Sequence, residues 1–302
     1  MAKKQYVWFD GKFVSFDKAN VHFLTHSLQY ASGIFEGIRA YDTEKGPAVF
    51  KLQEHMQRFQ NSARLYNMTL HFKAEELGKA IVQLIKKNGL KSCYIRPFGF
   101  YNDQRIGLGA SGKSTSVAIA ALDFGAYFSG KNEGISCMVA RWRRAGPETL
   151  PEHAKASGNY TNATLSSDEA KASGANEAIM LSSKGYVAEG PGENIFLVKN
   201  GKLVTPSVDS DILIGITRNS IIEIANSKGL KVEERHVKPE ELYSADEIFF
   251  TGTAAEVTPI IKVDGRKIGK GEVGTISQML MDSYADIVYG RNKKYEKWLT
   301  YV

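Results

Sequence analysis

The chain has 302 residues, of which 43% are hydrophobic, and its 39 basic and 33 acidic residues give a formal net charge of +6 at pH 7. The basic residues are scattered among acidic ones, which argues against a nucleic-acid-binding stripe. The sequence lacks the run of roughly eighteen apolar residues that a membrane span needs, and its N-terminal MAKKQYVWFDG has no apolar segment of signal-peptide length. We therefore expect a cytoplasmic protein that binds neither nucleic acid nor membrane. Its length suits two domains.

The first part of the chain carries the signals of hairpins and of two helices. Asp10-Gly11 separates two short apolar runs and supplies the positive φ angles of a tight hairpin turn. Apolar residues then recur at helical spacing in two segments, the second of which ends at Gly89. The expected elements are strands at residues 6–9, 12–14, 92–101 and 116–122 and helices at residues 52–66 and 74–88.

A glycine-containing segment, SGKNEG at residues 129–134, is the best candidate for a linker. It would separate a first domain at residues 1–128 from a second domain at residues 135–302. The second domain is expected to contain strands at 135–141, within 178–204, at 247–250 and at 260–263, and helices at 162–172, 217–227 and 275–289. Hairpins dominate and strands do not alternate regularly with helices, so the predicted fold class is α+β.

The cysteines and histidines do not have metal-ligand spacing. Cys93 and Cys137 have no cysteine neighbour, and we expect both to be buried thiols in a reducing compartment. His22 and His26 are four residues apart, but no third ligand follows at a suitable distance. The sequence therefore predicts no metal site.

Residues 107–114, GLGASGKS, match the phosphate-loop pattern G-x-x-x-x-G-K-[ST]. That mechanism needs a buried strand before the loop and a helix after it, whose N-terminal amides hold the phosphates. Here polar residues precede the loop, and residues 115–122 alternate in the manner of a strand. We therefore interpret the segment as a mobile glycine-rich loop.

Lys155 lies in the segment LPEHAKASGNY (150–160), surrounded by small residues and with no other cation beside it. A lysine amine becomes a nucleophile where its surroundings favour the uncharged form, and it then forms a Schiff base with an aldehyde. Taken alone, Lys155 is better explained as a surface lysine in an irregular loop, because the chain contains many lysines.

Two turns in the same half of the chain are candidates for binding a phosphate. Gly215-Ile216-Thr217 leads into a helix for which Thr217 is the expected N-cap, and Thr251-Gly252-Thr253-Ala254-Ala255 follows a strand. A lysine that reacts with aldehydes and two phosphate-binding turns together suggest pyridoxal 5′-phosphate. Glu189, at the end of an expected strand, is the candidate carboxylate for the pyridinium nitrogen, which it would keep protonated.

Several motifs resemble those of the class IV aminotransferases, which use pyridoxal 5′-phosphate and have fold type IV, the fold of D-amino acid aminotransferase. They are AKASGNY (154–160), AEGPGENIF (188–196), GITR (215–218) and TGTAAEVTP (251–259). In the first half, FEGIRAY (35–41), EHMQRF (54–59) and YIRP (94–97) resemble branched-chain amino acid aminotransferases in particular. The resemblance covers nearly the whole chain. It implies a smaller N-terminal α/β domain, a larger C-terminal domain, a cofactor between them, and a homodimer or a larger assembly of dimers.

The resemblance also assigns roles to single residues. Lys155 would form the Schiff base and then act as general acid and base, while Glu189 would pair with the ring nitrogen. Tyr160 would hydrogen-bond the phenolic oxygen of the cofactor. The phosphate would be bound by Arg58, Ile216, Thr217 and Thr253.

The substrate pocket implied by the resemblance accepts both glutamate and branched aliphatic side chains. Tyr94, with the backbone amides of Thr253 and Ala254, would bind the α-carboxylate, and Arg96 would pair with the γ-carboxylate of glutamate. The aromatic wall would consist of Tyr30, Phe35, Phe124 and Tyr127. The loop around Leu108 resembles the segment that reaches towards the partner subunit's site and would close over the substrate. Phe124 replaces a tryptophan of several bacterial relatives, which puts the ranking of substrates in doubt but leaves the reaction unaffected.

The sequence thus predicts an enzyme that transfers the amino group of L-leucine, L-isoleucine or L-valine to 2-oxoglutarate, forming glutamate and the branched-chain 2-oxo acids. D-amino acid aminotransferase and aminodeoxychorismate lyase share the fold and remain alternatives, which the FEG and YIRP motifs disfavour. A phosphate-loop nucleotide hydrolase using Lys113 and Ser114 is the alternative from a different class.

Overall fold

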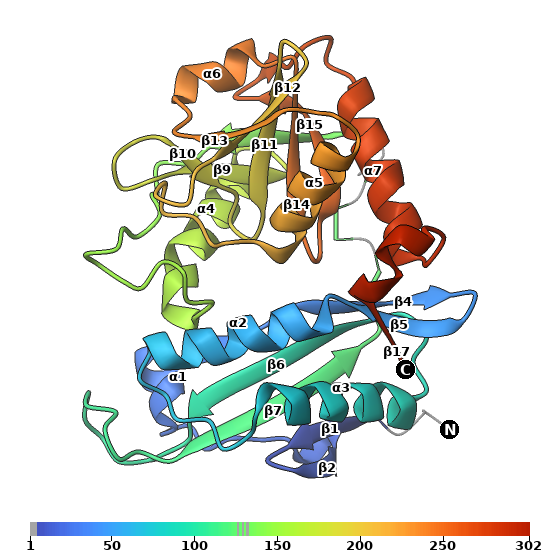
Figure 1. Cartoon of the computed structure of the whole chain (residues 1–302). Helices are drawn as coiled ribbons and strands as arrows, with labels where there is room; N and C mark the ends of the chain where they lie inside the picture. Colours follow the sequence, from blue (N-terminus) through green and yellow to red (C-terminus); the bar gives the residue numbers. More distant parts are fainter. Residues whose placement is uncertain (1–4, 126, 129, 131–132) are drawn as a thin grey trace. The chain divides into compact units, whose positions relative to one another are not determined.

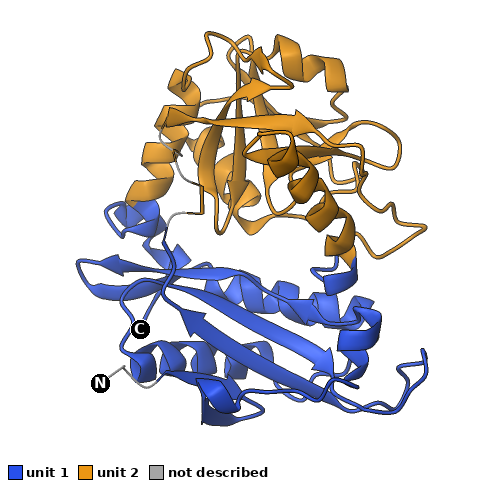
Figure 2. Ribbon diagram, turned by 180° about the vertical axis from the view of Figure 1, so that it is seen from behind, with its two compact units in different colours: residues 1–125, 154–158, 287–302 blue, residues 126–153, 159–286 orange. Residues whose placement is uncertain are grey.

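The computed structural model describes residues 5–125, 127–128, 130 and 133–302. Its contacts divide the chain into two compact units, shown in Figure 2. Unit 1 comprises residues 1–125, 154–158 and 287–302, and unit 2 comprises residues 126–153 and 159–286. The division falls near the predicted linker, of which residues 129, 131 and 132 lie outside the described part of the chain. It also assigns two later segments, 154–158 and 287–302, to unit 1. The single boundary at residues 129–134 stays a prediction.

Unit 1 is built on an antiparallel sheet of eight strands, in the order β17-β5-β4-β6-β7-β1-β2 with β3 added to β6. The longest strand, β6, pairs with β3, β4 and β7 and so organises the sheet (Figure 1). The elements of this unit are β1 (Tyr6–Phe9), β2 (Lys12–Ser15), α1 (His26–Tyr30), β3 (Ile34–Phe35), β4 (Ile38–Thr43), β5 (Gly46–Phe50), α2 (Leu52–Leu65), α3 (Ala74–Asn88), β6 (Cys93–Tyr101), β7 (Thr115–Leu122) and β17 (Leu299–Tyr301).

Local sequence explains the parts of unit 1 that were predicted. Asp10 and Gly11 have φ angles of 43° and 85°, so the β1–β2 turn has the positive φ angles that the sequence predicts. Helix α3 buries Leu77, Ile81 and Leu84 at helical spacing and ends at Gly89, whose φ of 57° is the left-handed conformation typical of a helix C-terminus. The predicted helices and strands of this unit are confirmed within a few residues at their ends.

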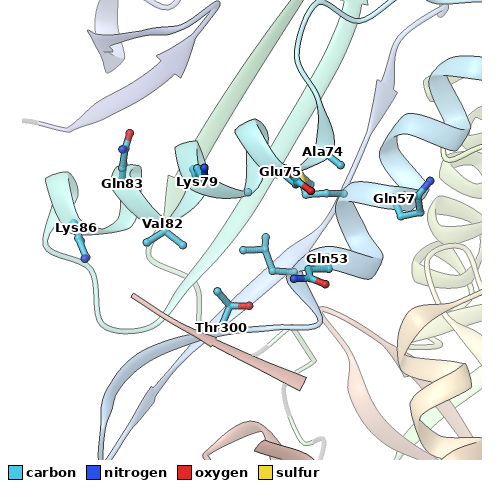
Figure 3. Close-up of a pocket in the computed structure, with 12 residues that line it drawn as sticks. Gln53, Gln57, Ala74, Glu75, Lys79, Val82, Gln83, Lys86 and Thr300 are labelled. Carbon is cyan, nitrogen blue, oxygen red and sulfur yellow. The ribbon is translucent and has the colours of Figure 1, made fainter. Parts of the chain in front are cut away.

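A groove between α2, α3 and the end of β17 forms a cavity of about 720 Å³ (Figure 3). Its lining includes the apolar side chains of Leu52, Met56 and Val82 and the polar side chains of Gln53, Lys79 and other residues. Among the described residues that line it, none belongs to the predicted cofactor or substrate site. The cavity is therefore a surface groove on the helical side of unit 1 and is separate from the predicted cofactor and substrate residues.

Unit 2 contains a mixed sheet of nine strands, in the order β10-β9-β8-β15-β14-β11-β12-β13 with β16 added to β15. An additional pairing of β10 with β11 closes six of these strands into a ring. The pairs β8–β9, β8–β15 and β12–β13 are parallel, and the others are antiparallel. The elements are β8 (Ile135–Val139), α4 (Thr161–Ala172), β9 (Glu177–Leu181), β10 (Val187–Glu189), β11 (Asn194–Lys199), β12 (Lys202–Pro206), α5 (Ile216–Ser227), β13 (Val232–Arg235), α6 (Pro239–Ser244), β14 (Glu247–Gly252), β15 (Glu256–Val263), β16 (Arg266–Lys267) and α7 (Thr275–Val288).

The predicted α+β class is correct, while some local predictions for unit 2 are not. Helix α5 begins at Ile216 with Gly215 as its N-cap, so the prediction of Thr217 as N-cap is wrong by two residues. Thr251 and Gly252, predicted as part of a turn, form the end of β14, because they pair with Val257 and Glu256 of β15. Through the described part of the chain, no helix is long and apolar enough to cross a membrane.

Candidate active site

Lys155 belongs to unit 1, where its segment lies along the short strand β3. The amide of Phe35 donates to the carbonyl of Lys155 at 2.9 Å, and the amide of Ser157 donates to the carbonyl of Gly33 at 2.8 Å. Ala156 forms an antiparallel bridge with Ile34. Ala154 and Ala156 are 1% and 0% exposed and belong to the core of unit 1, so their small size serves packing. This backbone pairing fixes the main-chain position of Lys155. Its Nζ lies 5.0 Å from the centre of the Phe35 ring.

One face of α2 organises the surroundings of this lysine. His55, Arg58 and Ser62 recur at helical spacing and therefore lie on the same side of α2. The amide of Lys155 donates to the hydroxyl oxygen of Ser62 at 2.9 Å. His55 and Arg58 both donate to the carboxylate of Glu36, the residue after β3. A single helix thus holds the lysine backbone and an ionic cluster beside it.

The Glu36 carboxylate is buried with its charge retained. Burial alone would raise its pKa, but the charges of Arg58 and His55 and their hydrogen bonds hold the pKa well below its usual range. Burial lowers the pKa of the His55 imidazole, Glu36 opposes that shift, and the charges of Arg58 and Lys155 add to it. Near neutral pH the cluster therefore contains one carboxylate, one guanidinium and a neutral imidazole.

The predicted substrate residues of β3, β6 and the segment after β7 lie together in unit 1. A guanidinium nitrogen of Arg96 donates to the hydroxyl oxygen of Tyr94 at 3.1 Å. The guanidinium carbon of Arg96 lies 4.9 Å from the centre of the Phe35 ring, and the rings of Tyr94 and Phe124 are 4.9 Å apart. A Cβ on Gly37 would lie 2.0 Å from the Tyr94 hydroxyl oxygen, so a larger residue there would displace the Tyr94 side chain. The structure thus brings four predicted pocket residues into one cluster.

Arg39 adjoins this cluster but was not singled out by sequence reasoning. It lies opposite Tyr94 in the β4–β6 pairing, and its guanidinium carbon is 5.8 Å from the centre of the Phe124 ring. In FEGIRAY, Arg39 follows Gly37 by two residues, so the two lie on the same face of an extended segment. That spacing was the signal that could have identified Arg39.

The glycine-rich segment at residues 107–114 is followed by the strand β7, so the helix that a phosphate loop requires is missing at that position. The predicted mobility of the loop stays a prediction. Lys113 donates to the carbonyl of Arg105 at 2.9 Å. The predicted substrate residue Leu108 is 77% exposed, and its carbonyl lies 3.1 Å from Nε2 of His26 on α1. His26 also packs against Tyr30, with ring centres 4.8 Å apart. The loop is thus attached to α1 at its tip.

In unit 2, Glu189 ends β10 with its carboxylate almost fully buried. Nε of Arg144 lies 2.9 Å from one carboxylate oxygen. The side-chain amide of Asn194 and the backbone amide of Leu213 donate to the other oxygen at 2.9 and 3.1 Å. Arg144 also donates to the carbonyls of Asp211 and Asn159. The sequence predicted Glu189 but not Arg144. The signal for Arg144 was only its charge, in the loop that follows a strand.

The two predicted phosphate-binding turns both belong to unit 2. At the start of α5, no side chain of the N-cap residue Gly215 is available to bind the first amides, and Thr217 is 3% exposed. A Cβ on Gly215 would lie 1.8 Å from the amide oxygen of Asn194, which explains the glycine. The hydroxyl of Thr251 at the end of β14 is buried without a hydrogen-bond partner among the described residues, and Thr253 and Ala254 form the turn that follows.

Two further predicted residues, Tyr127 and Tyr160, also lie in unit 2. Tyr127 is 46% exposed, and its ring packs edge-on against Phe128. Tyr160 directly precedes α4, where its carbonyl accepts a hydrogen bond from the Thr164 hydroxyl at 3.0 Å. Tyr127 is thus exposed, and Tyr160 is half-buried.

The two cysteines are not members of these clusters. Cys93 and Cys137 are buried free thiols, and burial raises the pKa of Cys93 to about 12. Neither thiol is poised for nucleophilic chemistry. The described residues contain no group of three or more histidine, cysteine, aspartate or glutamate side chains placed to hold a metal ion.

Comparison with known proteins places these clusters in a family. Residues 33–263 match the family model of amino-transferase class IV. The chain is 43% identical, over 99% of its length and 98% of that protein, to the branched-chain-amino-acid aminotransferase of Escherichia coli strain K12. It also resembles the crystal structure of branched-chain aminotransferase from Thermoproteus uzoniensis with norvaline, with a TM-score of 0.95 and 45% identity over 98% of this chain and 99% of that one.

The branched-chain amino acid aminotransferase from Thermobaculum terrenum, in its PLP-form, is similar as well, with a TM-score of 0.92 and 34% identity over 99% of this chain and 99% of that chain. These matches cover 98–99% of the chain. The chain belongs to the class IV aminotransferase family.

Proposed function

We propose that this protein is a branched-chain amino acid aminotransferase that uses pyridoxal 5′-phosphate and exchanges an amino group between L-leucine, L-isoleucine or L-valine and 2-oxoglutarate. The observation that carries this proposal is the full-length similarity to relatives with that activity, which includes the FEG and YIRP segments of the substrate cluster. Those segments supply Phe35, Tyr94 and Arg96, which adjoin one another in unit 1.

The residues fit the cofactor chemically. The helix start at Gly215, the hydroxyl of Thr251, which is buried with no partner among the described residues, and the guanidinium of Arg58 are the donors that a phosphate requires. Glu189 is a buried carboxylate suited to a protonated ring nitrogen, and Lys155 supplies the amine. When bound, pyridoxal 5′-phosphate supplies the aldehyde that accepts the amino group and the ring that withdraws electrons.

The chain's own groups would perform four tasks in the reaction. Nζ of Lys155 would take the proton from the α-carbon when the amino acid gives up its amino group. It would return a proton to the α-carbon when a 2-oxo acid receives the amino group. Glu189, held by Arg144, would keep the ring nitrogen protonated, and Tyr160 would donate to the phenolic oxygen. Arg58, Ile216, Thr217 and Thr253 would bind the phosphate.

Substrate recognition would combine charge with aromatic surface. Tyr94 and the amides of Thr253 and Ala254 would bind the α-carboxylate. The guanidinium of Arg96 lies next to Tyr94 and Phe35. It would pair with the γ-carboxylate of glutamate and would turn away when the substrate has an aliphatic side chain. Tyr30, Phe124, Tyr127 and Leu108 would complete the wall.

We further propose that the protein acts as a homodimer or an assembly of dimers in the cytoplasm. Ile106 and Leu108, two large apolar side chains of the glycine-rich loop that are 83% and 77% exposed, support this proposal, because exposed apolar surface beyond single scattered side chains marks interaction sites. The loop would reach towards the partner subunit's site. Gel filtration with light scattering tests the assembly.

The activity is tested with the purified protein and cofactor. We expect leucine and 2-oxoglutarate to give glutamate, with D-alanine inactive as the amino donor. Glutamate formation from D-alanine but not from leucine would instead identify a D-amino acid aminotransferase. Release of pyruvate from aminodeoxychorismate would identify the lyase of the same fold.

A further inference from the structure

Glu36 lies between two residues of the substrate cluster, yet its side chain points into the protein. Its neighbours Phe35 and Gly37 adjoin Arg96 and Tyr94, whereas the Glu36 side chain is 0% exposed. Alternation along an extended segment explains the opposite directions of successive side chains. Glu36 therefore cannot contact a substrate, and a carboxylate at this position needs another explanation.

The carboxylate of Glu36 accepts four hydrogen bonds. One oxygen accepts from Nε of Arg58 at 2.7 Å. The other accepts from a terminal nitrogen of Arg58 at 2.9 Å, from Nδ1 of His55 at 2.7 Å and, more weakly, from the amide of Gly37 at 3.3 Å. The pair with Arg58 is bidentate, and a bidentate pair fixes the plane of a guanidinium as well as its position.

Burial differs between the two members of this ion pair. The side chain of Glu36 is 0% exposed and that of Arg58 is 14% exposed. The carboxylate is thus the fixed member, held by His55 from a second side, and the guanidinium is the member that can contact a bound molecule. Because two N–H groups of Arg58 are bound to Glu36, the direction of the remaining guanidinium edge is determined.

We propose that Glu36 is a positioning residue of the cofactor site, which acts through Arg58 by holding its guanidinium in the orientation that binds the cofactor phosphate. This inference rests on the proposed function, in which Arg58 is a phosphate ligand. His55 supports the same orientation by fixing the carboxylate.

Charge and orientation lead to opposite expectations. A carboxylate beside a phosphate site repels the phosphate, so its removal should tighten binding if only charge matters. Glutamine at position 36 keeps one acceptor oxygen but turns an N–H group towards one of the Arg58 donors. If orientation dominates, Glu36→Gln should weaken phosphate binding even though it removes a negative charge.

The test compares pyridoxal 5′-phosphate with pyridoxal, which lacks the phosphate. Both aldehydes are titrated into the full-length, cofactor-depleted protein, and quenching of protein fluorescence gives their dissociation constants. Residues that orient a ligating group are worth about 10- to 100-fold in affinity where this has been measured at metal sites. We expect Glu36→Gln to raise the dissociation constant of pyridoxal 5′-phosphate by about tenfold, at the low end of that range. The constant for pyridoxal should stay unchanged.

A matched control and a second variant accompany this measurement. Glu177→Gln removes a carboxylate that is 3% exposed in unit 2, far from the cluster along the chain, and should leave both constants unchanged. His55→Ala removes the second support of Glu36 and should shift the phosphate-bearing ligand alone, by less than Glu36→Gln. It decides the question if Glu36→Gln does not fold, as judged by circular dichroism.

A double-mutant cycle tests whether Glu36 acts through Arg58. In the Arg58→Ala background, Glu36→Gln should have no further effect on the ratio of the two constants. An equal shift for both ligands, tighter binding of pyridoxal 5′-phosphate, or full additivity with Arg58→Ala would each overturn the proposal. Wild-type protein that shows no preference for the phosphate-bearing ligand and forms no glutamate from leucine would overturn the proposed function instead.

Discussion

Unit 1 contains the arginine–carboxylate pair Arg58–Glu36 and unit 2 contains the pair Arg144–Glu189, and we propose opposite uses for them. In unit 1 the carboxylate of Glu36 is 0% exposed and its arginine, Arg58, is 14% exposed. In unit 2 the side chains of Arg144 and Glu189 are 5% and 6% exposed, and backbone carbonyls hold Arg144 in place. In the function we propose, the guanidinium would therefore contact the cofactor in the first pair and the carboxylate in the second. A buried salt bridge does not reveal by itself which member is functional, whereas the other partners of each member do.

If both pairs serve the amine of Lys155, Lys155→Ala should lower kcat more than any other substitution proposed here. Loss of the general acid–base group alone should lower kcat by about 10²–10⁴-fold, and loss of the Schiff base should lower it further. Glutamate formation from leucine is the measurement. Lys91→Ala, at a side chain that is 79% exposed, is the control. Borohydride reduction followed by peptide mapping should label Lys155, and a label on another lysine would contradict the assignment.

The carboxylate of the second pair should be directly functional, so Glu189→Gln should impair the chemistry. Removal of one preorganised electrostatic partner typically costs about 10²–10³-fold in kcat, and we expect a loss in that range. Binding of pyridoxal 5′-phosphate should change much less. Glu36→Gln should show the reverse pattern, with cofactor affinity lowered more than kcat at saturating cofactor. The same pattern in both variants would abolish the distinction between the pairs.

Removal of the arginine should separate the pairs by stability and by its pH dependence. Arg144→Ala leaves a buried carboxylate uncompensated, which typically costs about 3–5 kcal/mol. Arg58→Ala should cost less, because loss of the Arg58 charge, one cause of the lowered pKa of His55, lets that pKa rise relative to wild type. In wild type, a folded pKa below the unfolded value of about 6.5 means that His55 lowers stability as pH falls, and a higher folded pKa in the variant makes this loss smaller.

Urea unfolding at pH 6 and pH 8 measures this difference. Relative to wild type, Arg58→Ala should be less destabilised at pH 6 than at pH 8, and Arg144→Ala should be destabilised nearly equally at both. An additional His55→Ala substitution should remove the pH dependence of the Arg58→Ala effect. A persistent dependence would assign it to another group.

Gly215→Ala sharpens the description of the second pair with the smallest expected effect. The added Cβ would lie 1.8 Å from the Asn194 amide oxygen, and the same amide holds Glu189. The φ of Gly215 is −73°, which alanine adopts without strain, so the effect is steric. Overpacking of this kind costs about 1–3 kcal/mol in unfolding free energy. Gly192→Ala, which would add a Cβ in open space, is the control and should be neutral.

Local sequence signals predicted the elements whose cause is local. The turn at Asp10-Gly11 and the end of α3 at Gly89 depend on positive φ angles that few residues adopt, and both are present. The strand β17 was not predicted, because Leu299–Tyr301 is a strand only through its pairing with β5. The N-cap of α5 was assigned to Thr217, because a hydroxyl residue is the usual cap, whereas packing against Asn194 requires Gly215 there.

The predicted site residues came from motifs, and those motifs mark the groups that would contact ligands. Arg144 and the Glu36 side chain were missed because their partners are distant in sequence, and only the folded chain brings them together. The pairing of the Lys155 segment with β3 was likewise not predictable, since nothing in the small residues around it specifies a partner strand.

Unit 1 is completed by two segments that the ribosome makes late. Residues 154–158 bring the lysine to β3, and residues 299–301 add the edge strand β17, although the rest of the sheet is encoded before residue 125. A chain that ends at the predicted linker therefore exposes β5 as an unfilled sheet edge and leaves β3, which pairs with β6, without the Lys155 segment beside it. A gene fragment ending at residue 128 thus encodes neither the completed sheet of unit 1 nor Lys155.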